Sequence, residues 1–277
     1  MQDETTFIDR LLAMQHSLDG GTAKLEIDPN EALRFYLPLA RTILDLPQQS
    51  ARRIVAIAGL PGSGKTAFTL TLALVINALA VNSLAASALT SIPVAAAVGM
   101  DGWHYSNAYL ESHSITHAGE ITSLRSIKGM PETFDVLAIA AFLRKARSGE
   151  TDLPYPVYSR KVHDPIPGGL LTASIQVILI EGNYLLLNEE PWRSLADFYD
   201  LRILITGEIE AFLPGLIERH RRGGKTDDLI EAWLKNVDIP NMHRIKAGSV
   251  AADITIHKIN SRRIEKVEYH HPKNGVE

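Results

Sequence analysis

The sequence has 277 residues, of which 45% are hydrophobic and 22% charged, a composition typical of a globular protein with a substantial core. Its formal net charge of −4 argues against a sequence-independent nucleic-acid binder, because such proteins present a basic face to phosphates. The lack of cysteine excludes disulfides, thiol catalysis, zinc–thiolate sites and thiolate-bound iron–sulfur clusters. The N-terminus is acidic and shows no apolar secretory signal, so we expect a cytoplasmic protein.

Residues 1–50 are predicted to form an N-terminal helical extension. A turn is expected at 19–21, and a second helix is expected to follow Asp28-Pro29. Apolar side chains recur at helical spacing in the first part of this segment, at Phe7, Leu11, Met14 and Leu18.

Short apolar runs follow, and helical patterns such as Val136–Arg147 and Ile209–His220 lie between several of them. Uninterrupted apolar runs are typical of strands that are covered on both faces. Their alternation with helices predicts an α/β fold, with a mostly parallel sheet and helices on both of its faces. The predicted strands are 54–58, 93–99, 175–180, 201–205 and 252–256.

Residues 59–66 read GLPGSGKT and match G-x-x-x-x-G-K-[ST] at every fixed position, between an apolar strand and a long helical pattern. The glycines permit a tight turn whose backbone N–H groups converge on phosphate oxygens. Lys65 is expected to reach the β- and γ-phosphates, and Thr66 to offer its hydroxyl oxygen to Mg²⁺. The expected nucleotide contacts are Gly59, Pro61, Gly62, Ser63, Gly64, Lys65, Thr66 and Ala67.

The uncharged stretch from Thr66 to Met100 is long enough to cross a bilayer. It follows the phosphate loop directly and contains Pro93 and many hydroxyl side chains, so we interpret it as a buried helix of the α/β core. The polar segment 103–130 is interpreted as an insertion over the site.

Two carboxylates, Asp101 and Glu181, stand at the ends of apolar runs, where open α/β sheets bind their ligands. Phosphoryl transfer to a hydroxyl needs a base near the acceptor and a carboxylate that orders the Mg²⁺ shell. The alternative for each residue is a cap or turn at the end of a strand. No N-K-x-D motif occurs, which argues against a GTPase.

The chain resembles the uridine kinase, phosphoribulokinase and bacterial pantothenate kinase family of P-loop small-molecule kinases. Within this family it looks most like bacterial kinases labelled fructose transport system kinases. The resemblance implies a P-loop NTPase fold with a kinase domain over 51–277, a lid at about 208–235, and use of ATP and Mg²⁺. Its blocks are GLPGSGKT (59–66), MDGWHYSNAYL (100–110), KGMPETFD (128–135), PVYSRKVHDPIPG (156–168), VILIEGNYLLL (177–187) and ERHRRGGK (218–225).

The resemblance assigns Asp101 as the base for the acceptor hydroxyl, and Glu181 together with Thr66 to Mg²⁺. Several polar side chains are needed to orient a polyol or acid acceptor. The alternatives without a binding role are a structural His104, a packed aromatic ring at Tyr158, and solvated charges at Arg125 and Lys128. The acceptor candidates are Asp101, His104, Arg125, Tyr158, Arg160 and Asn183.

The block at 218–225 matches the lid of the family. Arg219 and Arg222 share a helical face and are expected to stabilise the transferring group. The expected catalytic residues are thus Asp101, Lys65, Arg219 and Arg222. The alternative is a basic helix end that is stabilised by the helix dipole and capped by Gly223. In relatives the region of Ser249 and Ala251 lies close to adenine, so these two residues are expected to contact the base.

The sequence therefore favours an ATP-dependent kinase that phosphorylates a hydroxyl of a small sugar-like metabolite, with a fructose-like sugar first. Nucleoside and pantothenate kinases remain alternatives, because the PETFD and PVYS blocks are close to pantothenate kinases whereas GNYLLL is closer to the fructose-labelled group. A regulatory P-loop ATPase that acts on a protein partner is the alternative of a different class. We expect a monomer or homodimer with no structural metal and no nucleic-acid or membrane partner.

Overall fold

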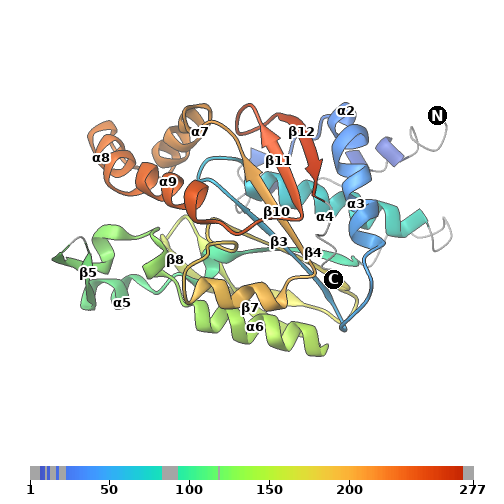
Figure 1. Ribbon diagram of the computed structural model, residues 1–277, viewed down its shortest axis with the longest axis horizontal. Coiled ribbons are helices and arrows are strands. Elements are labelled where there is room, and N and C mark those ends of the chain that lie inside the picture. The colour runs from blue at the N-terminus through green and yellow to red at the C-terminus, as the bar shows by residue number, and fades with distance from the viewer. Residues whose placement is uncertain are drawn as a thin grey trace, which may run out of the picture.

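Six strands form one central sheet in the computed structural model, and five of them run parallel (Figure 1). The sheet order is β12 (Ile264–Tyr269), β11 (Ile254–Lys258), β10 (Leu201–Thr206), β3 (Arg53–Gly59), β9 (Val177–Gly182) and β4 (Ala95–Gly99). The structure describes residues 7–9, 11–12, 17–18, 23–82, 93–117 and 119–270. The five predicted strands are the five parallel ones, and the α/β prediction is confirmed; the antiparallel edge strand β12 was not predicted.

The central strand β3 is buried on both faces because its alternate side chains feed two separate hydrophobic cores. Ile54, Ala56 and Ala58 pack into one core, and Val55 and Ile57 into the other. All five side chains are fully buried. This two-sided burial explains why the strand reads as an uninterrupted apolar run.

Helices cover both faces of the sheet, as the pattern predicted (Figure 1). The first core takes side chains from α6 (Val136–Ser148), α7 (Ile209–Arg222) and α9 (Ile239–Gly248). The second core takes side chains from α3 (Leu37–Leu44) and α4 (Lys65–Asn82).

The chain leaves β3 toward β4 and β9 on one side and later returns to β10 and β11 on the other. The connections therefore diverge at the carboxyl end of β3, next to Gly59. Ligands of open α/β sheets bind at such a position, outside the carboxyl ends of the strands.

The segment predicted as an N-terminal extension belongs to the second core where it is described. The helical turns α2 (Pro29–Glu31) and η1 (Ala32–Tyr36) lead into α3, and the Tyr36 ring lies 5.1 Å from that of Phe68 on α4. The helical prediction is wrong at Leu18, because β1 (Ser17–Leu18) pairs with β2 (Ala23–Lys24) in a small antiparallel ladder. Met14 lies outside the described residues.

The uncharged helix after the phosphate loop is a core element where the structure describes it. The side chains of Phe68, Leu72, Val75 and Ile76 on α4 are at most 1% exposed. In the described part of the chain, no helix combines the length and the apolar character needed to cross a membrane. Residues 83–92 of the uncharged stretch lie outside the described residues.

Short elements stand over the carboxyl edge of the sheet and flank the loop after β3 (Figure 1). The predicted insertion at 103–130 contains a helix, a two-stranded ladder and a 3₁₀ turn. The elements of this region are η2 (Met100–Trp103), α5 (Asn107–Ser112), β5 (Ser114–His117), β6 (Glu120–Ser123), η3 (Leu124–Ile127), η4 (Pro131–Thr133), β7 (Leu153–Ser159), β8 (Asp164–Leu171), α8 (Asp227–Trp233) and η6 (Leu234–Asp238). The 3₁₀ segment η5 (Trp192–Phe198) instead leads into the amino end of β10, and its Phe198 carbonyl accepts from Arg147 of α6.

Gly102→Ala is expected to destabilise the protein by about 2–3 kcal/mol, because overpacking forces backbone shifts. A Cβ at Gly102 would lie 2.1 Å from the carbonyl oxygen of Pro156 on β7. Gly119→Ala is the control, since nothing lies within 4 Å of its Cβ, and the positive φ of Gly119 costs about 1 kcal/mol. Urea unfolding of both variants measures the difference, and equal losses would show that the contact at Gly102 carries no strain.

Candidate active site

The loop between β3 and α4 has the conformation of a phosphate-binding loop. Gly62 and Gly64 adopt φ angles of +78° and +76°, in the left-handed region that favours glycine. Pro61 is buried, and Lys65 to Ala67 form the first turn of α4, so the free N–H groups of that turn face the loop. The hydroxyl of Ser63 is buried without a hydrogen-bond partner in the described structure. The loop thus presents backbone and hydroxyl donors suited to an anion.

The segment that follows β11 packs directly on this loop. A Cβ at Gly64 would lie 2.0 Å from the carbonyl oxygen of Ser261, so this position accepts no side chain. The Lys258 ammonium donates to the same carbonyl over 2.7 Å and is buried. Burial lowers the pKa of Lys258 to about 8, although the carboxylate of Glu31 acts in the opposite direction. Residues 259–263 therefore form one wall beside the phosphate loop.

Ser249 and Ala251 lie in the segment between α9 and β11, and their contact with the base stays a prediction. The N–H of Val250 donates to the carbonyl of Leu186 over 2.8 Å, and β11 begins three residues after Ala251. Because β11 is parallel to β3, the residues before it enter at the amino end of the sheet, whereas the phosphate loop lies at the carboxyl end.

Lys65 is buried beneath the loop and donates to the carbonyl oxygen of Leu60 over 2.9 Å. Burial lowers the pKa of its ammonium to about 8. The carboxylates of Glu181 and Asp101 raise this pKa, and the guanidinium of Arg219 lowers it. The side chain predicted to reach the phosphates is thus within electrostatic reach of three other predicted site residues.

Thr66 and Glu181 meet at the junction of α4 and β9. The Thr66 hydroxyl donates to Oε1 of Glu181 over 2.8 Å. Both groups offer oxygen atoms, which are the ligands that Mg²⁺ prefers, and both stand beside the loop. The donor set therefore fits the metal of a Mg·nucleotide, in which phosphate oxygens and water supply the remaining ligands.

Asp101 follows β4 and stands in η2 at the same edge of the sheet. Burial raises the pKa of its carboxyl, but the positive charges of His104, Arg160, Arg219 and Lys65 outweigh burial, so the pKa lies below its ordinary value of 3.8. Asp101 is therefore an ionised carboxylate at neutral pH, facing the cations of the phosphate loop and of α7.

His104 and Tyr158 lie next to Asp101. Nδ1 of His104 lies 2.9 Å from the carbonyl oxygen of Asp101, and its ring is 3.8 Å from the ring of Phe134. The ring of Tyr158 on β7 lies 5.2 Å from that of His104. Burial, reinforced by the charge of Asp101, raises the pKa of Tyr158 to about 12, so its hydroxyl remains a donor. Arg160, directly after β7, influences both Asp101 and Tyr158.

Arg125 and Asn183 lie farther out. Arg125 stands on η3, is partly exposed and pairs with Glu111 over 3.6 Å, yet its charge reaches Lys128 and Tyr158. Asn183 is half-buried and comes two residues after Glu181. Both remain proposed acceptor ligands.

The two lid arginines are separated in space. The guanidinium of Arg219 on α7 is half-buried, makes no hydrogen bond or ion pair within the described part of the chain, and influences Lys65 and Asp101. The side chain of Arg222 is 55% exposed and lies 4.0 Å from Glu218, one turn earlier on the outer side of α7. A shared helical face at three-residue spacing was thus too coarse a criterion, and the structure brings Arg219 alone of this pair into the cluster.

The loop after α7 is fixed by buried polar contacts. The Lys225 ammonium donates to Nδ1 of His220 over 3.0 Å, and Nε2 of His220 lies 2.8 Å from Asp238. The same ammonium stands 4.2 Å from the ring centroid of Trp233 on α8. These contacts hold the lid turn against its own helices. Gly223 has φ −78°, and Gly224 is the residue with positive φ.

Sequence reasoning missed the burial of Lys128 and Lys258 and the partial burial of Lys225. Lys128, interpreted as a possible solvated charge, is 8% exposed, and burial lowers its pKa to about 8. A block in the resemblance contained Lys128, but nothing in its local pattern signalled that the ammonium is enclosed.

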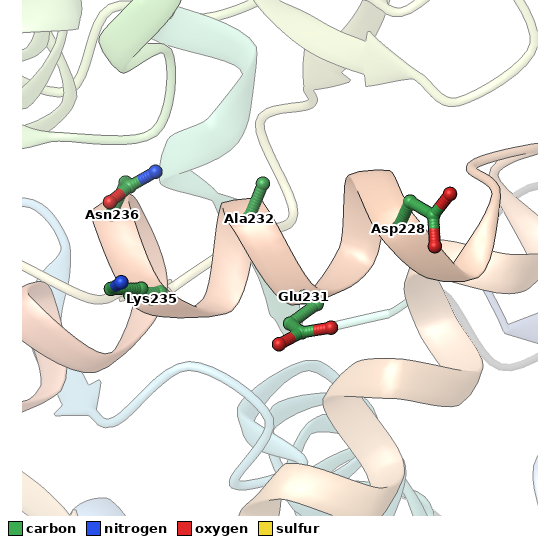
Figure 2. A pocket seen from close by; sticks show the side chains of 5 residues that line it. All are labelled: Asp228, Glu231, Ala232, Lys235 and Asn236. Carbon is green, nitrogen blue, oxygen red and sulfur yellow. The ribbon is translucent and has the colours of Figure 1, made fainter.

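A hollow on the surface of α8 and η6 is distinct from this cluster. It has a volume of about 450 Å³ and lies on α8 and η6 (Figure 2). None of the residues discussed above lines it. The lining residues are Asp228, Glu231, Ala232, Lys235 and Asn236.

Binding of Mg·ADP is expected to weaken as the pH rises past about 8, the pKa of Lys65 in the free protein. Phosphate oxygens favour the ammonium form, so binding raises this pKa and the complex takes up protons between the two values. Calorimetry in buffers of different ionisation enthalpy between pH 7 and 9.5 measures the uptake. Lys258→Met is the matched variant, because Lys258 has a similarly lowered pKa. Loss of the uptake in Lys258→Met would assign the proton to Lys258 instead.

Comparison with known proteins agrees with this geometry. The family described as Phosphoribulokinase / Uridine kinase matches residues 54–265. The uncharacterized protein YggC of Escherichia coli is 30% identical over 248 residues, which cover 88% of this chain and 95% of that protein. A pantothenate kinase of Enterococcus faecalis is 28% identical over 196 residues, which cover 60% of this chain and 59% of that protein.

A solved structure from Silicibacter sp. TM1040, described as a "putative fructose transport system kinase", is similar along nearly its whole length. It superposes with a TM-score of 0.66 at 29% identity and covers 79% of this chain and 98% of that chain.

Proposed function

This chain belongs to the phosphoribulokinase and uridine kinase family and is an ATP-dependent small-molecule kinase, and we propose that it phosphorylates a hydroxyl of a small sugar-like metabolite. A fructose-like framework is the first acceptor class, because the solved structure with 29% identity carries a fructose-related description. The alternatives within the class are nucleosides and pantothenate.

The observation that carries the proposal is the mutual influence of Asp101 and Lys65. The carboxylate raises the pKa of Lys65, and the ammonium lowers the pKa of Asp101. Arg219 acts on both groups. The proposed base and the two proposed phosphate-binding cations are thus within electrostatic reach of one another, as transfer of a γ-phosphate to an acceptor hydroxyl requires.

In the proposed reaction Asp101 accepts a hydrogen bond from the acceptor hydroxyl and then its proton, as the hydroxyl oxygen forms the new bond to the γ-phosphorus. The bond to the β,γ-bridging oxygen breaks, and ADP leaves. Lys65 and Arg219 stabilise negative charge on the transferring group. Ser63 and the backbone N–H groups of the loop hold the remaining phosphates.

Thr66 and Glu181 are the proposed holders of Mg²⁺, which neutralises phosphate charge when it is bound. Segment 259–263 beside Gly64 is our proposed wall for the nucleotide base, and contact of Ser249 and Ala251 with the base stays a prediction. Action in the cytoplasm as a monomer or homodimer, without a nucleic-acid or membrane partner, stays part of the proposal.

The alternative of a regulatory ATPase needs a surface for a protein partner, and residues 1–50 and 66–100 are the candidates for that surface. Where they are described, the helices of 29–44 and α4 contribute their apolar side chains to the hydrophobic core, and so do not present them to a protein partner. The enclosed Asp101, with His104 and Tyr158 beside it, also suits a small acceptor better than a protein partner.

The test is ADP release from Mg·ATP across a panel of ketoses, aldoses, polyols, nucleosides and pantothenate. One chemical class is expected to stimulate release, with stimulation strongest for sugar-like compounds. If pantothenate or a nucleoside alone stimulates ADP release, that compound replaces the sugar-like metabolite as the assigned acceptor. A rate of ADP release that is the same with and without each acceptor would contradict acceptor phosphorylation by this protein.

A further inference from the structure

Lys128 is an enclosed cation on the acceptor side of the site. Its ammonium donates to Oδ1 of Asn107 and to the carbonyl oxygen of His163, each over 2.7 Å. It also stands 5.2 Å from the ring centroid of Tyr158. Two of its three N–H groups are thus used by neutral acceptors, and the aromatic ring that it contacts is the one that packs against His104.

No carboxylate in the described part of the chain forms an ion pair with Lys128. The nearest acidic influences are Asp164 and Asp101, and both are weaker than the effects of burial and of Arg125 on the pKa of Lys128. Asp164 is itself engaged, because its Oδ1 accepts from the backbone N–H of Asn107 over 2.8 Å. A buried ammonium that lacks an anionic partner destabilises the folded protein, so a lysine at this position favours a role in binding an anion.

Other charged groups act on this part of the site, and one of them, Arg125, pairs with Glu111 over 3.6 Å. Arg125 influences Tyr158, Lys128 and Lys225, and Arg160 influences Tyr158. Asp101 and Asp164 are the carboxylates that act on Tyr158 and Lys128. A neutral polyol leaves the buried ammonium of Lys128 with neutral acceptors only, whereas an oxyanion accepts a charge-assisted hydrogen bond from it.

We propose that Lys128 binds a carboxylate or phosphate group of the acceptor, so that the substrate is a sugar acid or sugar phosphate rather than an uncharged sugar. The inference rests on the proposed function, because it takes Asp101 as the base at the reacting hydroxyl. The Tyr158 ring lies 5.2 Å from the His104 ring and 5.2 Å from the Lys128 ammonium, so the proposed oxyanion site and His104 adjoin the same ring.

The test compares acceptors that differ by one oxyanion. Fructose is paired with fructose 1-phosphate and fructose 6-phosphate, glucitol with gluconate, and glycerol with glycerate. The wild type is expected to favour one anionic member by about 10- to 100-fold in kcat/KM. Preference for a phosphate ester or for a carboxylate identifies the oxyanion.

Lys128→Met is expected to abolish most of this preference through KM rather than kcat, while Lys128→Arg keeps a large part of it. Lys161→Met is the matched control, because Lys161 is an exposed lysine in the turn of the β7–β8 hairpin, which also holds the His163 carbonyl that Lys128 contacts. If Lys128→Met does not fold, the Lys128→Arg variant and the wild-type preference decide. Equal or better use of the neutral members by the wild type, or an equal loss for both members in Lys128→Met, would overturn the inference.

A binding measurement separates failure of the inference from failure of the proposed function. Calorimetry with Mg·AMPPNP present measures the affinity of each acceptor without turnover. Lys128-dependent binding of an anionic member without phosphorylation would uphold the oxyanion site and contradict the proposed reaction. Absence of any anion binding would overturn the inference whatever the turnover.

Discussion

Asp101→Asn is expected to lower kcat by about 10²- to 10⁴-fold, the usual contribution of a positioned general base. The amide retains the size of the carboxyl but cannot accept the proton of the hydroxyl. The KM for Mg·ATP is expected to change little, because the phosphate loop binds ATP without Asp101. Steady-state kinetics at saturating ATP and acceptor measure the effect.

The same substitution has a stability signature. The pKa of Asp101 is lowered in the folded protein, so the carboxylate contributes stability above its ordinary pKa of 3.8, and this contribution is lost as the pH falls through the folded value. Asp101→Asn is therefore expected to melt below the wild type at pH 7, with a gap that narrows in acid. Unchanged kcat in a folded Asp101→Asn variant would show that Asp101 is not the general base.

Arg219→Ala is expected to lower kcat by about 10²- to 10³-fold, comparable to the loss of one preorganised donor at a charged transition state. Its guanidinium influences both Lys65 and Asp101, and so faces the space where charge develops on the transferring group. Single-turnover rates at saturating substrates isolate this step from product release.

Arg222→Ala supplies the matched control on the same helix. Arg222 is exposed and lies near Glu218, so its truncation is expected to change kcat less than about threefold and stability by less than about 0.5 kcal/mol. Equal losses in Arg219→Ala and Arg222→Ala would show that both arginines act in the reaction, as the spacing alone suggested.

Features with a local signature were predictable from the sequence. The strand at 54–58 is recognisable as an uninterrupted apolar run because both of its faces are buried. The GLPGSGKT loop is recognisable because its function needs the glycines and Lys65 at fixed, close positions in the chain. Asp101 and Glu181 were placed together because parallel strands end at one edge.

Features that depend on how distant segments meet were not predictable in this way. The segment that holds Ser249 and Ala251 enters β11 at its amino end, whereas the phosphate loop lies at the carboxyl end of β3, and proximity in the sequence could not show this difference. The wall of the phosphate loop comes from Ser261, almost two hundred residues later than Gly64, and forms through the order of strands in the sheet. The burial of Lys128 requires Asn107 and the β7–β8 hairpin, which no local pattern connects.

The central claim is direct transfer of a phosphoryl group from ATP to an acceptor hydroxyl that is activated by Asp101. The most direct measurement follows ATP labelled at its γ-phosphorus and separates labelled acceptor from labelled inorganic phosphate. The account predicts that the label enters an organic acceptor in the wild type and that this transfer falls with Asp101→Asn. Label that appears solely as inorganic phosphate, at the same rate in both proteins and regardless of the acceptor, would contradict it.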